Sequence, residues 1–264
     1  MKRNMSVAGS FYPANSTEIK RYFAHFSKLY DETKQLPHIK PKAVIVPHAG
    51  YVYSGYTADI AYRMLQNAGL KTVVVLGPSH RVAFEGVSLG RYESYETPFG
   101  VIEANDILAK EIAERFGLAF VASAHVEHST EVQFPFIKYY LPDVRIVELI
   151  YSDTTPFYLS KIIEFVLEKK DCGVIISTDL SHFYTQSDAN KLDSVCLNAI
   201  ANLDLKALHQ GCEACGRIGV EAMLQSAIKM ELQTQILDYR TSADASGDMS
   251  RVVGYVSACF MDKN

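Results

Sequence analysis

The feature that most constrains the fold of this chain is a set of three short runs of apolar residues. They cover residues 43–46 (AVIV), 72–77 (TVVVLG) and 173–176 (GVII). Runs without polar alternation are typical of strands covered on both faces, as in a sheet with helices on each side. The pattern predicts a three-layer α/β/α fold around a central, largely parallel sheet.

A histidine follows each run within a few residues. His48 comes after the first run, His80 after the second, and Asp179 and His182 after the third. A single histidine at a strand end is commonly a hydrogen-bonded turn residue. In open α/β sheets, however, ligands bind beyond the carboxyl ends of the strands. We therefore expect these four side chains to share one site.

The remaining segments complete the α/β pattern. Segment 86–100 alternates and contains glycine and proline, which favours antiparallel pieces and a mixed sheet. A strand is predicted at 145–153, and two closing strands flank the polar loop near Asp244. Helical spacing predicts helices at about 15–31, 56–68, 105–117, 155–170, 187–202 and 217–229. Since no linker or repeat interrupts this order, residues 1–264 are predicted to form one domain.

Composition narrows the classes of function. Apolar residues make up 48% of the chain and charged residues 21%, and the formal charge is -4, so nucleic acid is an unfavoured partner. No apolar run approaches the roughly 18 to 20 residues of a membrane-spanning helix. The odd number of cysteines (five) and the lack of a secretory signal pattern favour a reducing, cytoplasmic location without membrane attachment.

The strand-end residues suit a metal. Two imidazoles and one carboxylate leave open positions on non-haem Fe(II), and the same set would hold catalytic Zn(II). His48 and His80 are the predicted imidazole ligands. The carboxylate is left open at this point, because Asp179, Asp244 and Asp248 all lie in loops beside predicted strand ends.

Further residues have predicted roles near this site. His182, three residues after Asp179, and His128, directly after Glu127, are candidates for a general base or substrate clamp, because histidine titrates near neutrality. The aromatic residues predicted to line a pocket are Phe11, Tyr51 and Tyr53. Cys212 and Cys215 form one CxxC pair without a second pair or a thioredoxin-like context, which favours a packing or loop role.

Six motifs in order resemble the Memo family from about residue 6 to residue 260. The motifs are AGSFYP, PHAGYVYSG, LGPSH, EHSTEVQFPF, STDLSHF and ACGRIGV. The resemblance implies a fold similar to the class III extradiol dioxygenases, in which two histidines and an acidic residue bind Fe(II). Carried over by motif, the implied ligands are His48, His80 and Asp244, with Asp179 and His182 beside the metal. Asp248 is the alternative third ligand if the loop turns tightly.

The resemblance also implies functions and partners. The first is a cytoplasmic, metal-dependent oxidoreductase with Fe(II), or Cu or Zn in its place, that acts on an unidentified small or protein-borne substrate. One alternative is a non-catalytic adaptor that binds a ligand or phosphopeptide in the same pocket. A further alternative, which follows from the ligand set rather than from the resemblance, is a zinc hydrolase. Prokaryotic members of the family tend to occur with an AMMECR-type protein and a radical-SAM protein, which are the implied pathway partners.

Overall fold

A mixed sheet forms the centre of the computed structural model, which describes residues 1–263. The eight-stranded sheet has the order β10-β11-β2-β8-β3-β7-β4, with β9 paired to β11. Its strands are β2 (Ala43–Val46), β3 (Thr72–Pro78), β4 (Val87–Leu89), β7 (Arg145–Tyr151), β8 (Cys172–Ser177), β9 (His182–Tyr184), β10 (Gln233–Thr241) and β11 (Val252–Met261). A smaller sheet contains β1 (Lys2–Arg3), β5 (Ser94–Thr97) and β6 (Gly100–Glu103).

The apolar runs form the parallel middle of the main sheet. β2 and β3 both pair in parallel with β8, and β7 pairs in parallel with β3. All four residues of β2 and all seven of β3 are buried, as expected for strands covered on both faces. At the two sides, β11 and β4 add in antiparallel fashion. The prediction of a mixed sheet is confirmed, and parallel pairing is confined to its four middle strands.

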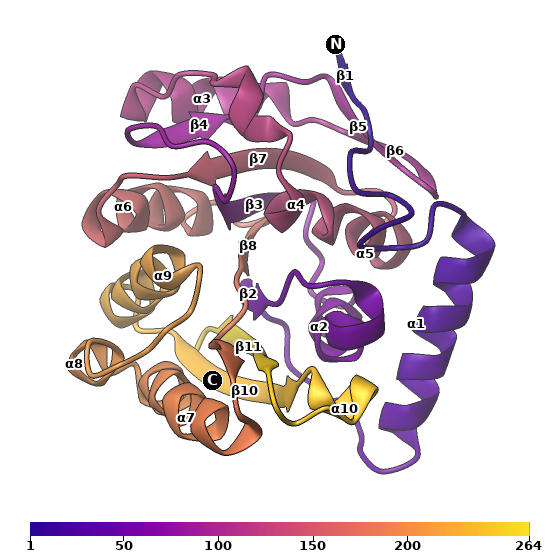
Figure 1. Cartoon of the computed structure of the whole chain (residues 1–264). Helices are drawn as coiled ribbons and strands as arrows, with labels where there is room; N and C mark the ends of the chain where they lie inside the picture. Colours follow the sequence, from indigo (N-terminus) through magenta and orange to yellow (C-terminus); the bar gives the residue numbers. More distant parts are fainter. Residues whose placement is uncertain (264) are drawn as a thin grey trace.

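Helices cover both faces of this sheet (Figure 1). α1, α2 and α5 pack on one face and α6, α7 and α9 on the other, and each face has its own apolar cluster. The α-helices are α1 (Ser16–Asp31), α2 (Tyr51–Leu65), α3 (Asp106–Phe116), α4 (His128–Glu131), α5 (Gln133–Tyr140), α6 (Pro156–Leu167), α7 (Gln186–Asn202), α8 (Leu205–Leu208), α9 (Arg217–Lys229) and α10 (Ala243–Ser246). No helix within residues 1–263 has both the length and the apolar character needed to cross a bilayer.

Local sequence signals account for several helix ends. α1 begins after Asn15, whose side chain accepts a hydrogen bond from the Glu18 N–H. α3 is capped at its C-terminal end by Gly117, which has a left-handed φ of 65°. One predicted boundary differs, because α2 begins at Tyr51 rather than near residue 56. The motif after His48 is therefore helical from its first tyrosine, which shortens the loop that carries this histidine.

Close packing at Gly77 brings the end of β3 against α4. A Cβ atom built at Gly77 would lie 2.4 Å from Ser129 Oγ and 2.8 Å from Thr130 Cγ2, so a side chain there would displace α4. The Ser129 hydroxyl also donates a hydrogen bond of 2.8 Å to the carbonyl of Pro78. This contact holds the end of β3, and the His80 that follows it, beside the first turn of α4.

Candidate metal centre

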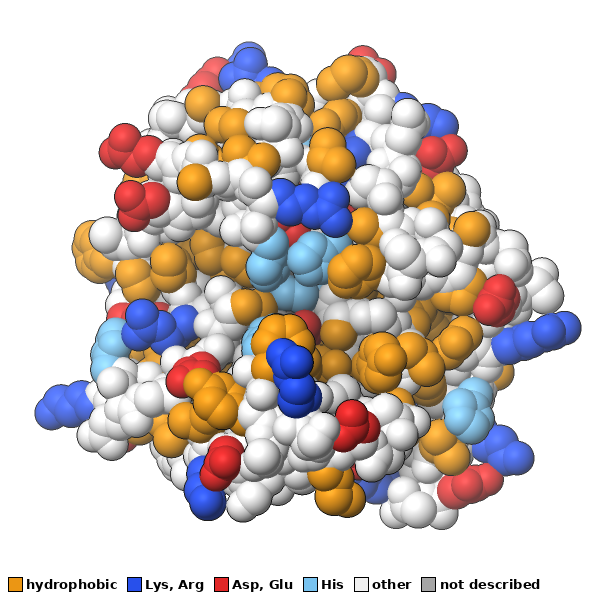
Figure 2. Space-filling model, in the orientation of Figure 1, with side chains coloured by type: hydrophobic (Ala, Val, Ile, Leu, Met, Phe, Trp, Pro, Cys, Tyr) orange, Lys and Arg blue, Asp and Glu red, His pale blue; other side chains and the backbone are white. Residues whose placement is uncertain are grey.

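Three histidines converge at the carboxyl ends of the parallel strands. Ligand atoms of His48, His80 and His128 all lie within 4.8 Å of one another. The ring centroids are 5.1 Å apart for His48 and His80, 4.6 Å for His80 and His128, and 5.3 Å for His48 and His128. Figure 2 shows a patch of histidine side chains in a hollow of the surface, between apolar and basic groups. His48 and His80 thus lie together at this edge of the sheet, as expected for residues that follow parallel strands.

The order of the strands explains why His48 and His80 meet. β8 lies between β2 and β3, so the residues that follow β2 and β3 face each other across the end of β8. The end of β8 holds His48 in place. The His48 N–H donates to Asp179 Oδ1 at 2.8 Å, and its Nδ1 lies 2.9 Å from Ser177 Oγ.

Glu127 holds the other two histidines. One carboxylate oxygen accepts a hydrogen bond of 2.7 Å from the His80 N–H, and the other lies 3.2 Å from His80 Nδ1. The same oxygen is 2.8 Å from His128 Nδ1, but off the direction of a regular hydrogen bond. Burial alone would raise the pKa of Glu127. The contacts with His128 and His80 outweigh burial and hold this pKa well below its usual value, so the carboxylate is charged.

The charges of this cluster fit a bound cation. Burial, reinforced by the neighbouring His80 and His128, lowers the pKa of His48 and keeps it in the neutral form that ligates metals. His80 behaves differently. Burial disfavours its charged form, but the proximity of Cys215 and Glu127 prevails and raises the pKa of His80 to about 10. The buried, charged Glu127 carboxylate and the neutral His48 imidazole are the groups of this cluster that suit a cation.

Cys215 joins the cluster from the loop before α9. Its Sγ lies 3.3 Å from His48 Nε2 and accepts a hydrogen bond of 3.3 Å from the Asp179 N–H. Sequence reasoning missed this residue, because the CxxC spacing by itself favours packing. Its place in ACGRIGV, one of the motifs that carry the family resemblance, is the signal that could have found it.

The other cysteine of the CxxC pair has a different partner. Cys212 forms a disulfide with Cys196 of α7, 16 residues earlier, while Cys172, Cys215 and Cys259 are free. The predicted packing or loop role suits Cys212, which is buried in the disulfide, but it does not describe Cys215, which lies beside His48. Cys212 links the loop before α9 to α7 through the disulfide, and the Cys215 sulfur lies 3.3 Å from His48 Nε2.

The structure does not bring Asp244 or Asp248 into the histidine cluster. Asp244 is exposed in α10, and its Oδ2 accepts a hydrogen bond of 2.8 Å from the Thr241 N–H. Asp248 accepts from the N–H and hydroxyl of Ser250. The loop that contains Asp244 and Asp248 follows β10, which is an outer strand separated from β2 by β11. The ring of His128, in contrast, lies 4.6 Å from the ring of His80. The third converging side chain is thus a histidine.

The predicted residues Asp179 and His182 lie at this end of the sheet. Asp179 is 4% exposed, and its Oδ2 is 3.9 Å from His48 Nε2. Burial raises the pKa of Asp179, against the effect of the His48 N–H and the charges of His182, His128 and His80. His182 is half-buried at the start of β9, and its charge acts on both Asp179 and His48. Asp179 therefore holds His48 by accepting a hydrogen bond from its N–H, whereas His182 lies nearer the solvent.

The three predicted aromatic residues line one cavity beside the histidines. Phe11, Tyr51 and Tyr53 border a cavity of about 220 Å3, and the Phe11 ring centroid is 4.6 Å from that of His128. The Tyr51 hydroxyl is used internally, since it donates to the Val132 carbonyl at 2.8 Å. Tyr53 is 44% exposed and presents its ring to solvent.

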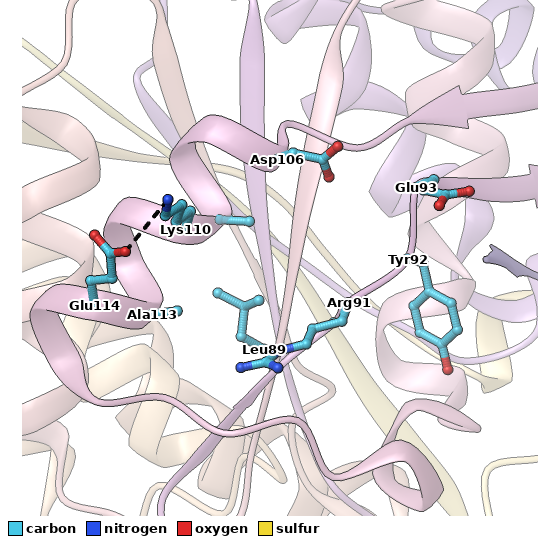
Figure 3. A pocket seen from close by; sticks show the side chains of 10 residues that line it. Leu89, Arg91, Tyr92, Glu93, Asp106, Lys110, Ala113 and Glu114 are labelled. Carbon is cyan, nitrogen blue, oxygen red and sulfur yellow. Dashed lines mark ion pairs between the residues drawn. The ribbon is translucent and has the colours of Figure 1, made fainter.

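A separate cavity of about 350 Å3 lies between α3 and the segment after β4 (Figure 3). Its apolar floor includes Leu89 and Ala113. Its rim mixes charges of both signs, with Arg91 opposite the Lys110–Glu114 ion pair of 3.8 Å. None of the predicted site residues borders this cavity, so it is not part of the histidine centre.

Comparison with known proteins identifies the same family as the six sequence motifs. The family described as Memo-like protein matches residues 3–259. A MEMO1 family protein from Methanobrevibacter smithii is 36% identical over 98% of this chain and 100% of its own length. MEMO1 family proteins from Sulfurisphaera tokodaii and Aquifex aeolicus are 34% and 31% identical, over 99% and 98% of this chain and 100% and 99% of their own lengths. The chain belongs to the Memo family.

Proposed function

We propose that this chain is a metalloprotein that binds one first-row transition-metal ion and uses it for oxidoreductase chemistry. The observation that carries the proposal is the convergence of His48, His80 and His128 within 4.8 Å at the carboxyl ends of the sheet. Three protein ligands leave coordination positions for substrate, which is the arrangement of catalytic rather than structural metal sites.

The donors favour a metal of intermediate softness. Imidazoles suit Fe, Cu and Zn, and the Cys215 sulfur next to His48 Nε2 adds a softer donor. Fe(II) is the metal we propose, because with open positions it supplies chemistry between O2 and an organic substrate. The resemblance to the Memo family supports the same choice, because it implies a fold similar to the Fe(II)-binding class III extradiol dioxygenases.

The chain's own residues prepare the site for this chemistry. Glu127 fixes the orientation of His80 and His128 by its contacts with their Nδ1 atoms, and such outer carboxylates hold metal-binding imidazoles in place. Asp179 fixes His48 through its backbone N–H. His182 is available for proton transfer to or from a substrate, because it is half-buried and is not one of the three converging histidines.

A second candidate is a zinc hydrolase. Three histidines without a carboxylate are a known ligand set of catalytic zinc, which lowers the pKa of its bound water. An adaptor that only binds a ligand would keep the pocket and show neither activity. Metal identity and O2 consumption separate these candidates.

The test starts from protein purified without oxygen. Metal content is measured by inductively coupled plasma mass spectrometry. Wild type should contain one metal ion per chain, and the His48→Ala, His80→Ala double variant should contain none. His209→Ala is the matched control, because this histidine is 53% exposed, pairs with Glu221 and is not one of the three converging histidines. Full metal content in the double variant would overturn the proposal. Iron-loaded wild type should then consume O2 with a catechol or thiol, and His182→Ala should keep the metal and lose this activity.

A further inference from the structure

The cavity beside α3 is a concave site apart from the histidine centre (Figure 3). Its volume of about 350 Å3 is large enough for a small molecule, since such pockets span roughly 300 to 1,000 Å3. The residues that line it come from two segments, 89–93 and 106–114. The three converging histidines do not border it. A ligand in this cavity would therefore not need the metal.

Two alanines of α3 keep the cavity open. Ala109 and Ala113 are four residues apart, so their methyl groups lie on the same face of the helix. They border the cavity together with Leu89, the last residue of the edge strand β4. A methyl group is too short to fill the space between the helix and the strand. The result is an apolar floor that suits the apolar part of a small ligand.

The wall after β4 is held in place by close packing. The Gly90 N–H donates a hydrogen bond of 2.9 Å to the carbonyl of Glu148. A Cβ atom built at Gly90 would lie 2.7 Å from the Tyr95 hydroxyl and 3.0 Å from Glu148 Oε2, so the segment lies directly on the buried residues below it. The backbone that carries Arg91 is thus ordered before a ligand arrives, which lowers the entropic cost of binding.

The opposite wall begins at an equally well-fixed residue. Asn105 caps α3, because its Oδ1 accepts a hydrogen bond of 3.0 Å from the Leu108 N–H. The Asn105 amide also donates a hydrogen bond of 2.7 Å to Thr72 Oγ1 at the start of β3. Asp106 follows as the first residue of α3, so its position is fixed relative to the main sheet.

Most charges around the cavity are already paired. The charged residues that border it are Arg91, Glu93, Asp106, Lys110 and Glu114. Glu93 pairs with the amino group of Met1 at 2.7 Å, and Lys110 pairs with Glu114 at 3.8 Å. Among residues 1–263, neither Arg91 nor Asp106 forms an ion pair, and the two come from different walls (Figure 3). One positive and one negative group therefore remain free at this cavity.

We propose that this cavity binds a short linear zwitterion. Its carboxylate pairs with Arg91, its ammonium group pairs with Asp106, and its apolar middle lies on Leu89 and the two alanines. A guanidinium binds a carboxylate through two parallel N–H bonds, and a carboxylate accepts hydrogen bonds from an ammonium group. Because the free charges belong to different walls, a molecule with charges at both ends matches both of them. Short peptides and ω-amino acids share this chemistry.

Four probes of similar size test the proposal on the full-length chain. They are ε-aminocaproate, the dipeptide alanyl-leucine, caproate and hexylamine. Titration of isotope-labelled protein followed by NMR reports both the affinity and the place of binding. At least one zwitterion should bind about 5-fold or more tightly than caproate and hexylamine. Its shifts should concentrate in residues 89–93 and 106–114. The tighter of the two zwitterions distinguishes a peptide from an ω-amino acid.

Two charge variants separate the ends of the ligand. Arg91→Gln should abolish the preference for the zwitterion over hexylamine, which lacks the carboxylate. Asp106→Asn should abolish the preference over caproate, which lacks the ammonium group. Thermal unfolding accompanies this variant, because an acid in the first turn also complements the helix dipole. Arg115→Gln and Glu111→Gln are the controls, since both residues are exposed on α3 and do not line the cavity.

A third variant tests the cavity itself. Ala113→Leu should fill the space above Leu89 and remove the binding of all four probes, with the NMR signals of the rest of the chain unchanged. Ala122→Leu is the matched control, because Ala122 is exposed and does not line the cavity. It should bind the probes as wild type does. Wild-type binding in Ala113→Leu would overturn the proposal.

The remaining outcomes also decide the matter. Unchanged preferences in an Arg91→Gln, Asp106→Asn double variant would overturn the proposal. Binding of the zwitterions no tighter than that of the single-charge probes, or no binding of either zwitterion at millimolar concentration, would do so as well. The His48→Ala, His80→Ala variant should bind the zwitterion as wild type does. If it does not, the ligand belongs to the histidine centre. If it does, the zwitterion site stands even where the metal proposal fails.

Discussion

The guanidinium of Arg3 donates a hydrogen bond of 3.1 Å to the backbone carbonyl of Glu127, across 124 residues of sequence. Its Nε also donates to the His125 carbonyl at 2.9 Å. Arg3 is 4% exposed, and its charge is balanced by Glu131 at 2.7 Å and Glu148 at 3.4 Å. The third residue of the chain thus fixes the segment that carries Glu127 and His128 to the histidine cluster.

Arg3→Gln is expected to weaken metal binding although Arg3 touches no ligand atom. Without the hydrogen bonds from Arg3, the segment that carries Glu127 and His128 is less firmly held. Disturbing the groups that orient metal ligands usually costs roughly 10 to 100-fold in metal affinity. The variant should also lose about 3 to 5 kcal/mol of unfolding free energy, because Glu131 and Glu148 remain buried without their partner. Competition titration with Co(II) and urea unfolding measure the two effects.

Lys2→Gln is the control for this prediction. Lys2 forms an ion pair of 2.9 Å with Glu96, and its side chain is 45% exposed. Such surface pairs contribute about 0 to 1 kcal/mol. Lys2→Gln should therefore leave metal affinity unchanged. Wild-type metal affinity in Arg3→Gln would show that the segment holds its position without the arginine.

The identity of the third metal ligand follows from comparing His128→Ala with Asp244→Ala. We expect His128→Ala to lose far more metal affinity, because Asp244 is exposed and bonded to the Thr241 N–H. Asp248→Ala should match wild type. Elemental analysis after gel filtration provides the measurement. An empty site in Asp244→Ala, with His128→Ala still loaded, would mean that the loop after β10 moves onto the metal.

Cys215→Ser should change which metal the centre prefers. A thiolate favours Cu(I) over harder ions, so this variant should lose Cu(I) affinity while retaining Fe(II) and Zn(II) more nearly intact. Cys172→Ser is the control, because Cys172 is also free and half-buried but begins β8 at the opposite end from the histidines. The sulfur-to-Co(II) absorption band should vanish in Cys215→Ser alone. If the band persists in Cys215→Ser, the Cys215 sulfur does not bind the metal.

The strand-end histidines could be predicted because their position depends on local pattern. An apolar run followed by His48 or His80 specifies a buried strand and the residue just beyond its end. The parallel pairing of both strands with β8 then follows from general rules of α/β sheets. The same rules could not select among carboxylates, since a loop such as residues 242–251 has no periodic pattern to fix its path.

The remaining site residues depend on contacts between distant segments. Glu127 and His128 are placed by Arg3 and by the packing of Ser129 against Gly77. Cys215 reaches His48 from 167 residues away. None of these contacts has a signature within a window of sequence, so only the folded arrangement, or a motif shared with relatives, identifies them.

The Cys196–Cys212 disulfide is expected to support both the fold and the site. A closed loop of about 15 residues contributes roughly 3 kcal/mol to stability, and this bridge also anchors the segment that leads to Cys215. Reduction should lower the unfolding free energy and weaken Cu(I) binding, and Cys196→Ser should do the same without reductant. Denatured protein should show three free thiols before reduction and five after it. Five thiols before reduction would exclude the bridge in the isolated protein.

A buried carboxyl on α2 should make stability depend on pH. Burial raises the pKa of Asp59 to about 7, against the hydrogen bonds from the Tyr140 and Ser27 hydroxyls. The unfolded value is about 3.9, so between about pH 4 and pH 7 the folded chain binds more protons at this group than the unfolded chain. Stability should therefore fall as pH rises through this window, by at most about 1.4 kcal/mol per pH unit from this group.

Asp59→Asn isolates this contribution, because asparagine keeps an oxygen that accepts from the Tyr140 hydroxyl but does not ionise. Urea unfolding between pH 4.5 and pH 8 should show a flatter dependence in the variant than in wild type, so that the variant gains relative stability as the pH rises. Asp143→Asn, at an exposed position, should leave the wild-type dependence unchanged. If Asp59→Asn keeps the wild-type slope, the buried carboxyl is not the group that titrates in this range, and a different ionisation must account for it.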